Sequence, residues 1–332
     1  MALTINTNVA SLVAQRNLSN ATNALNTAIE RLTTGFTINH ADDNAAGYSI
    51  AKMWVTQLGS LDVAADNAST GADMLTTAEE NYALLTNHLQ RIRDLTEQAA
   101  NGTYGSQSLK SIHAEIVARL QEINRIAANV EFNGIQLMDG TGVNANGLNL
   151  QVGLYANENS RINLSQSLFS SANLTGLFTG LASKTSAGGV DLSTLMGAAK
   201  SGATVDDLKD NANGSIEALA AVCSGLKYVD GKMVLQQTEN YEPMQMLEFL
   251  DSAINDISNR VTKIGAAQNR ITSALASLDV QSQNITSSLS TLRDTDVARE
   301  SSNYLQAQIL QQASATLLST ANQLPSVALN LL

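Results

Sequence analysis

One apolar pattern constrains the fold of this chain more than any other: residues 244–323 carry a nearly unbroken helical repeat. One seam position recurs every seven residues, at Ile271, Leu278, Ile285 and Leu292. The other seam position is occupied by Leu275 and Leu289. One continuous helix over this range would approach ~120 Å at the standard rise per residue. Because such a rod cannot bury its apolar stripe against itself, other helices must lie along it.

The N-terminal half supplies helices of matching pattern. Alternating alanines and leucines step by four and three residues in one heptad seam: Ala14, Leu18, Ala21, Leu25, Ala28 and Leu32. Further apolar stripes run over residues 75–92 and 109–126. We expect a helix to resume near Ala45 and to continue towards residue 100, with breaks at Gly59 and Gly71. The chain is therefore expected to fold back on itself, with its terminal helices paired.

The composition changes between the two helical halves. Residues 148–154 and 161–164 alternate apolar and polar side chains, which predicts a β-hairpin. Residues 168–242 are rich in turn-forming residues, with short helical patterns near 191–200 and 214–225. A tight hairpin turn is then expected at Asp230–Gly231. We interpret this part as a small α+β variable insert at the far end of a mainly α, long-helix coiled-coil rod.

Five segments follow from these patterns. Residues 1–44 and 296–332 are predicted to form the two halves of a terminal coiled-coil (inner core) domain. Residues 45–167, which include the hairpin, and 243–295 are predicted to form the helical rod domain. Residues 168–242 are predicted to form an outer, variable domain.

The two ends of the chain carry almost no charge. Arg16 is the single charged residue in residues 1–29, and none occurs from Ser301 to Leu332. Exposed neutral helices with apolar stripes associate with one another. We therefore predict that the ends are assembly segments, buried between molecules through these side chains: Leu18, Leu25, Leu32, Leu305, Ile309 and Leu317.

Several classes of function are excluded by composition. A net charge of -11 provides no basic stripe for a nucleic-acid partner. No apolar run approaches the length of a membrane span. The N-terminus lacks a secretory signal peptide, so the chain is expected to be cytoplasmic or exported without a cleaved signal.

No active site is expected. The lone Cys223 lies in an apolar run, where a buried and inert thiol is favoured over a nucleophile. The three histidines, His40, His88 and His113, lack the spacing of a metallopeptidase motif, and no glycine-rich phosphate loop occurs. We therefore expect no catalytic residues, no cofactor and no metal.

Long stretches at both ends resemble bacterial flagellin. On the N-terminal side they read INTNVASLVAQRNLSNATNALNTAIERLTTGFTIN, HADDNAAGYSIA, QRIRDLTEQAANGT and FNGIQLMDG. On the C-terminal side they read IGAAQNRITSA and AQILQQASATLLSTANQLPSVALNLL. The resemblance covers residues 1–165 and 245–332. It departs at the turn, where Asp42 and Asp43 are not preceded by the usual lysine.

The resemblance implies a subunit of the extracellular flagellar filament. It also implies export in an unfolded state through the flagellar type III apparatus, followed by polymerisation at the filament tip. The implied partners are further copies of the chain, the flagellar cap, hook-associated proteins and an export chaperone. Folding of the two ends is expected to accompany assembly.

The stretch QRIRDL resembles the flagellin patch that the host flagellin-sensing Toll-like receptor recognises. Carried over by position, Arg91, Leu95 and Glu115 would be the receptor contacts. The same residues could instead serve packing between subunits, and Arg91 could form an i, i+3 pair with Asp94.

Two alternative functions remain at this stage. A hook–filament junction protein of the same family shares the folded-back helical frame, although the C-terminal ending favours flagellin. A cytoplasmic coiled-coil scaffold would carry charged positions beside its seam, which the neutral ends lack. Glycosylation of the Ser/Thr-rich stretch 165–185 is left open.

Overall fold

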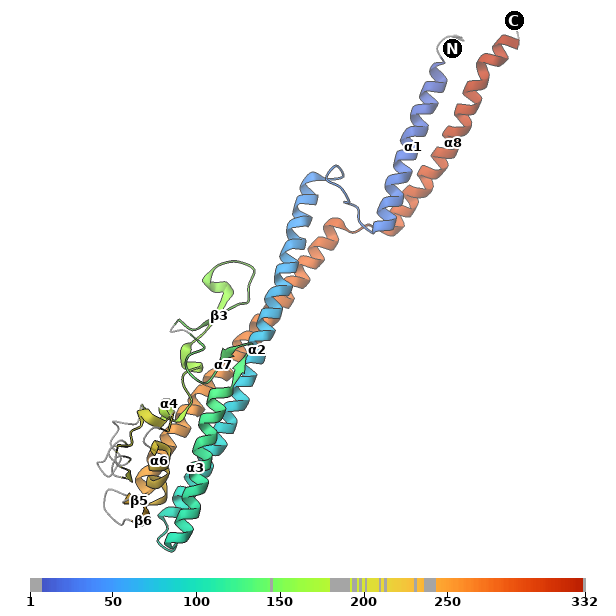
Figure 1. Cartoon of the computed structure of the whole chain (residues 1–332). Helices are drawn as coiled ribbons and strands as arrows, with labels where there is room; N and C mark the ends of the chain where they lie inside the picture. The colour runs from blue at the N-terminus through green and yellow to red at the C-terminus, as the bar shows by residue number, and fades with distance from the viewer. Residues whose placement is uncertain are drawn as a thin grey trace. The chain divides into compact units, whose positions relative to one another are not determined.

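The fold is a set of long helices, with three short hairpins among the residues that the structure describes (Figure 1). The computed structural model describes residues 8–143, 146–179, 192, 196, 199–200, 202–208, 210–211, 214–229, 232–235 and 243–330. The chain divides into two compact units. The terminal unit comprises Met1–Asp62 and Asp279–Leu332, and the central unit comprises Val63–Leu278.

The terminal unit is built on two paired helices, α1 (Val9–Thr34) and α8 (Val297–Asn330), which run antiparallel side by side (Figure 1). The Asn8 side chain caps α1 by accepting a hydrogen bond from the Ser11 backbone N–H at 3.1 Å. At its other end, Gly35 adopts the left-handed conformation that closes many helices. The prediction of a mainly α fold with paired terminal helices is confirmed.

The expected continuous helix over 244–323 is wrong, because the helix breaks at residues 294–296. The Thr295 backbone N–H donates to the Gly35 carbonyl at 2.9 Å, which ties the break to the segment after α1. The Asp296 carboxylate then accepts hydrogen bonds from the backbone N–H groups of Ala298 and Arg299, and so caps the start of α8. An acidic side chain that the heptad pattern ignored therefore begins the second helix.

Further contacts hold the segment after α1 against the end of α7 (Pro243–Arg293). The Thr37 backbone N–H donates to the Arg293 carbonyl at 2.7 Å, and the Arg293 guanidinium lies 3.9 Å from the centre of the Phe36 ring. Nearby, Asp43 accepts hydrogen bonds from the backbone N–H groups of His40 and Asn39, which lower the pKa of its carboxyl. The acidic turn therefore organises the chain between two helices.

The central unit packs α3 (Ser106–Asn129) with the parts of α2 (Ala45–Ala100) and α7 (Pro243–Arg293) that lie within Val63–Leu278, around one apolar core. The predicted breaks of α2 at Gly59 and Gly71 are wrong, because α2 is continuous. Gly71 instead allows close packing: a Cβ at that position would collide with the side chain of Leu150.

The predicted apolar stripes line this core. In α2 the six stripe residues are fully buried: Leu75, Ala78, Tyr82, Leu85, Leu89 and Ile92. The α3 stripe is buried along its whole length: Leu109, Ile112, Ile116, Ile123 and Ile126. In α7 the stripe is buried at Ile271 and Leu278 and becomes half-buried towards residue 292.

Two hairpins follow α3. The first joins β1 (Glu131–Phe132) to β2 (Ile135–Gln136) through Asn133 and Gly134, which both have positive φ, as in tight hairpin turns. The second is the predicted one and pairs β3 (Leu148–Gln151) with β4 (Arg161–Leu164).

The insert region consists of short elements, of which α6 (Ser215–Ser224) packs on α3. Its hairpin pairs β5 (Leu226–Val229) with β6 (Lys232–Leu235), while the predicted turn residues Asp230 and Gly231 lie outside the described residues. Most of the helix predicted near 191–200 lies outside them too. The remaining short elements are η1 (Glu158–Ser160), η2 (Gln166–Leu168), α4 (Leu174–Thr179) and η3 (Asp206–Leu208).

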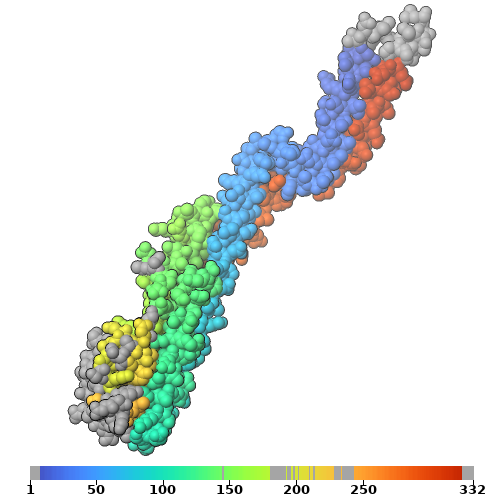
Figure 2. Space-filling view, in the orientation of Figure 1, coloured from blue at the N-terminus to red at the C-terminus, as the bar shows by residue number. Residues whose placement is uncertain are grey.

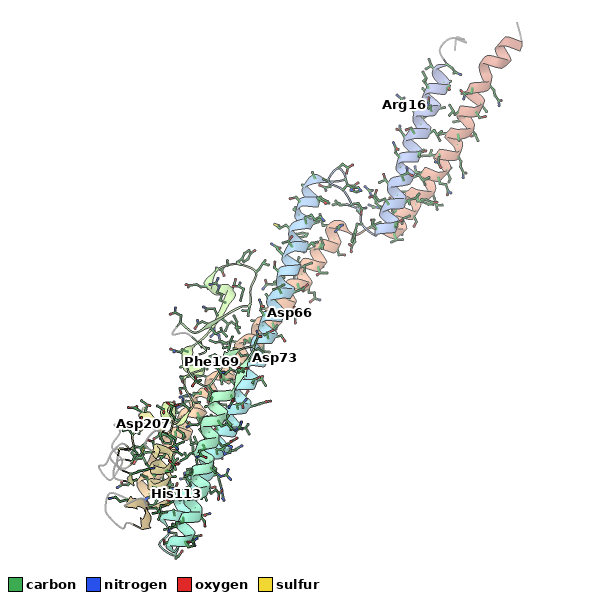
Figure 3. The ribbon with its side chains drawn as sticks, viewed as in Figure 1. Arg16, Asp66, Asp73, His113, Phe169 and Asp207 are labelled. Atoms are coloured by element: carbon green, nitrogen blue, oxygen red, sulfur yellow. The ribbon has the colours of Figure 1, made fainter. Side chains whose placement is uncertain are left out.

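Large apolar side chains of the insert region, including Phe169 and Phe178, belong to the same core as the long helices (Figure 3). The five-segment division of the chain, with residues 168–242 as a separate domain, stays a prediction.

Candidate assembly surface

Small side chains form the seam between α1 and α8. On α1 the buried residues are Ala14, Ala21 and Ala28, and on α8 the seam is buried at Glu300, Ala307, Ser314 and Ala321. Leu18, Leu25 and Leu32 flank the α1 alanines and are half-buried. Alanine and serine let the two helices approach closely, but they bury little apolar surface.

The larger apolar side chains of α8 are exposed to solvent, and one of them, Leu317, borders the groove between α1 and α8. Leu305, Ile309 and Leu317 are 54%, 65% and 61% exposed. On α1, Leu12 and Ile29 are exposed as well. The six predicted assembly residues are thus split between two environments: the three of α1 flank the seam, and the three of α8 point to solvent.

Amide and hydroxyl groups connect the two helices along their length. The Asn8 side-chain amide donates to the Ala321 carbonyl at 2.7 Å, and the Gln311 amide donates to the Thr22 hydroxyl at 3.2 Å. An open groove of about 730 Å³ runs between α1 and α8, lined mostly by Asn and Ala together with Leu310, Leu317 and the charged Arg31 and Glu300. Figure 2 shows the two helices packed along their length.

Electrostatics do not oppose association of this surface. Arg16 is the one charged side chain in the described part of α1 before Glu30, and it is exposed (Figure 3). The described residues of α8 after Glu300 carry no charge. Such a surface can contact a second copy without burying an unpaired charge.

A second candidate surface lies on α2 and α3 in the central unit. Arg91 and Glu115 form a two-point ion pair, with Nε to Oε1 at 2.9 Å and Nη2 to Oε2 at 3.3 Å. Arg119 also donates to Glu115, at 3.1 Å. The hydrogen bond from Arg91, with that from Arg119, lowers the pKa of the Glu115 carboxyl. The ionic partner of Arg91 thus comes from α3 and not from its own helix.

Leu95 does not share this surface. It is only 2% exposed and belongs to the core of the central unit. Of the three residues carried over as receptor contacts, the structure brings Arg91 and Glu115 together at the surface and places Leu95 beneath it.

The buried polar groups of the central unit have structural roles. Cys223 is fully buried, and burial raises the pKa of its thiol to about 12, which favours the unreactive protonated form. The His113 ring nitrogen Nδ1 lies 3.3 Å from the Ser224 hydroxyl, where α3 meets α6 (Figure 3). Within the described residues, no cluster of His, Cys, Asp and Glu could hold a metal ion, and no helix is long and apolar enough to cross a bilayer.

One anchoring residue, Arg260, was not singled out by sequence reasoning. It is buried on α7, where its guanidinium donates to the carbonyls of Ser170 and Ser171 at 2.8 and 3.0 Å and pairs with Asp256 at 2.7 Å. The sequence could have indicated this role, because Arg260 occupies a position in the apolar seam of α7 that continues at Ile264.

Comparisons with known proteins identify the family of the chain. Residues 5–142 match the bacterial flagellin N-terminal helical region, and residues 247–332 match the bacterial flagellin C-terminal helical region. Polar flagellin F of Vibrio parahaemolyticus and Flagellin D of Vibrio anguillarum are each 32% identical, over the whole of both chains. A solved structure of FliC from Burkholderia pseudomallei has a TM-score of 0.38 at 21% identity, covering 60% of this chain and 99% of that one. The chain therefore belongs to the bacterial flagellin family.

Proposed function

We propose that this flagellin forms its filament by burying the outer apolar faces of α1 and α8 against neighbouring copies of itself. Flagellins are structural proteins of the extracellular flagellar filament and not enzymes. The observation that carries the proposal is the row of exposed apolar side chains, Leu305, Ile309 and Leu317, on a helix without nearby charge.

The energetics suit a polymer. Burying one Leu or Ile side chain contributes ~1.5–3 kcal/mol relative to leaving it in water. Association consumes much of this gain through lost translational and rotational freedom, so a single contact between two copies is weak. A head-to-tail helical lattice repeats the contact for every subunit, and the filament is stable although each interface is modest.

A triple substitution tests the proposal: Leu305→Gln, Ile309→Gln and Leu317→Gln together. These side chains point to solvent, so the monomer should keep its helical content, whereas seeded polymerisation should be lost. Ser302→Gln with Ser319→Gln is the matched control, because both positions are exposed and polar on the same helix. Filament growth is followed by light scattering and electron microscopy. Wild-type growth of the triple variant would contradict the proposal.

Family membership also supports a proposal about how the chain is exported and which proteins it meets at the filament. We propose that the chain is exported unfolded through the flagellar type III apparatus with the help of a chaperone, and that it meets the cap and hook-associated proteins at the filament. Strains lacking the export apparatus should retain the chain inside the cell. Detection outside such cells at wild-type levels would overturn this step.

The junction-protein alternative makes a different prediction about abundance. A filament subunit should be a main component of sheared filaments, whereas a hook–filament junction protein would be a trace component. Quantitative mass spectrometry of sheared filaments distinguishes the two functions.

Recognition by the host flagellin-sensing Toll-like receptor is a separate proposal. It is supported by the surface ion pair of Arg91 and Glu115 and by the resemblance of the surrounding stretch. Arg91→Ala with Glu115→Ala should reduce receptor signalling by the monomer. Arg125→Ala with Glu122→Ala is the matched control, because it removes another exposed ion pair from α3. Unchanged signalling by the first variant would refute the proposal, since Leu95 is buried and cannot replace the contact.

A further inference from the structure

The loop between α2 and α3 contains an Asn–Gly dipeptide in a turn that the Asn side chain closes. The Asn101 side-chain oxygen accepts a hydrogen bond from the Thr103 backbone N–H at 3.2 Å, forming a turn closed by the side chain. Both Asn101 and Gly102 are exposed. Within the described part of the chain, no group accepts a hydrogen bond from the Gly102 backbone N–H.

This turn holds an oxygen that would gain charge in a reaction between two neighbouring groups. The ring that the hydrogen bond closes contains both the side-chain amide carbon of Asn101 and the backbone nitrogen of Gly102. Attack of that nitrogen on the amide carbon would place negative charge on the Asn101 side-chain oxygen. The Thr103 N–H already points at this oxygen and would stabilise the charge as it develops. A donor already positioned at a developing oxyanion is one of the ordinary sources of rate acceleration.

We propose that Asn101 is a site of self-modification, at which the folded loop promotes deamidation to aspartate and isoaspartate. The Gly102 nitrogen loses its proton to a base in solution and forms a bond to the Asn101 amide carbon. The bond from that carbon to the side-chain nitrogen breaks, and ammonia leaves with a proton from water. Water then opens the cyclic imide at either carbonyl, which gives aspartate or isoaspartate and introduces no other reagent.

Two other Asn–Gly pairs within the described residues lie in different settings, while Asn213, which precedes Gly214, lies outside those residues. Asn133 and Gly134 form the turn between β1 and β2, with φ of 49° and 78°, and strand pairing holds both neighbours. Gly147 follows Asn146 and packs against the backbone of Leu164. Neither setting shows the hydrogen bond that Asn101 accepts.

The modification would change the end of α2. A carboxylate at position 101 lies just after the helix, where the helix dipole is negative and repels added negative charge. A groove at this end of α2 is lined by Asn101 together with Asp94 and Glu97, whose carboxylates would repel the new charge further. The last turn of α2 should therefore become less protected from hydrogen exchange, as it should in an Asn101→Asp variant.

Peptide mass spectrometry of the full-length protein in warm, mildly alkaline buffer tests the proposal. In the folded protein, Asn101 should deamidate more than ~10-fold faster than Asn133, since one donor placed at a developing oxyanion is worth at least that much. In urea the two rates should become similar. Equal rates in the folded protein, or the same rate ratio in urea, would overturn the proposal.

Gly102→Ala provides the matched control. Nothing lies within 4 Å of a Cβ at this position, so the loop should keep its structure. The added methyl group hinders attack by the backbone nitrogen, and deamidation of Asn101 should slow several-fold. A folded Gly102→Ala protein that deamidates at the wild-type rate would also contradict the mechanism.

Discussion

The two units of this flagellin bury their apolar residues in opposite ways. The central unit encloses large side chains completely, among them Tyr82, Leu89 and Phe169. The α1–α8 pair of the terminal unit buries mainly alanines and leaves Leu305, Ile309 and Leu317 in solvent. The same mainly aliphatic composition therefore produces a fully buried apolar core in one unit and exposed apolar side chains in the other.

This difference separates folding from assembly. A fully packed core supplies stability within one molecule. A helix pair that buries mostly alanine gains little from its own seam, because hydrophobic stabilisation scales with the apolar area removed from water. We infer that the terminal helices depend for much of their stability on contacts between subunits.

The largest effect on the monomer should come from emptying the central core. Leu89→Ala should lower the free energy of unfolding by ~2–5 kcal/mol, through lost burial and the cavity left behind. Ile309→Ala on the outer face of α8 should change it by no more than ~0.5 kcal/mol. Urea denaturation of both monomers measures the contrast. Comparable losses for the two variants would erase the proposed difference between the units.

A smaller loss is expected when the anchor of the insert region is removed. Arg260→Met keeps an apolar stem but leaves the carbonyls of Ser170 and Ser171 without their donor, which should cost ~1–3 kcal/mol. Arg270→Met is the control on the same helix, because Arg270 is exposed. Hydrogen exchange of residues 168–172 should increase in the first variant and remain unchanged in the second.

The smallest effect is a pH dependence confined to the central unit. Burial lowers the pKa of His113, so the folded state favours the neutral ring. The unfolded chain takes up the proton first as pH falls below ~6.5, and stability therefore declines below that value and is constant above it. His113→Gln should flatten the dependence, measured as urea midpoints across this range. Burial also lowers the pKa of His88, so His88→Gln is the necessary comparison.

Sequence periodicity predicted the helices well because their packing follows simple repeats. The seam through Ala14, Ala21 and Ala28 and the stripe of α2 are buried as the spacing indicated. Periodicity does not show whether another molecule will cover a stripe. The outward direction of Leu305 and Ile309 became clear only once α1 was seen to occupy the neighbouring face.

The errors arose where single residues override the repeat. Gly71 was expected to break α2, but it allows Leu150 to approach the helix. Asp296 was read as part of a continuous helix, but its carboxylate caps a new one. The first hairpin escaped notice although Asn133–Gly134 is a strong turn signal. Burial of Leu95 depends on the packing of the surrounding helices, which local sequence does not reveal.

Hydrogen exchange of α8 in the monomer and in the seeded filament tests the central claim most directly. We expect the amides of residues 301–323 to exchange quickly in the monomer and to become strongly protected in the filament. The amides of α3 should be protected equally in both states, because their core is complete within one molecule. Full protection of α8 in the monomer, or no gain on polymerisation, would contradict the view that the terminal helices are completed by neighbouring subunits.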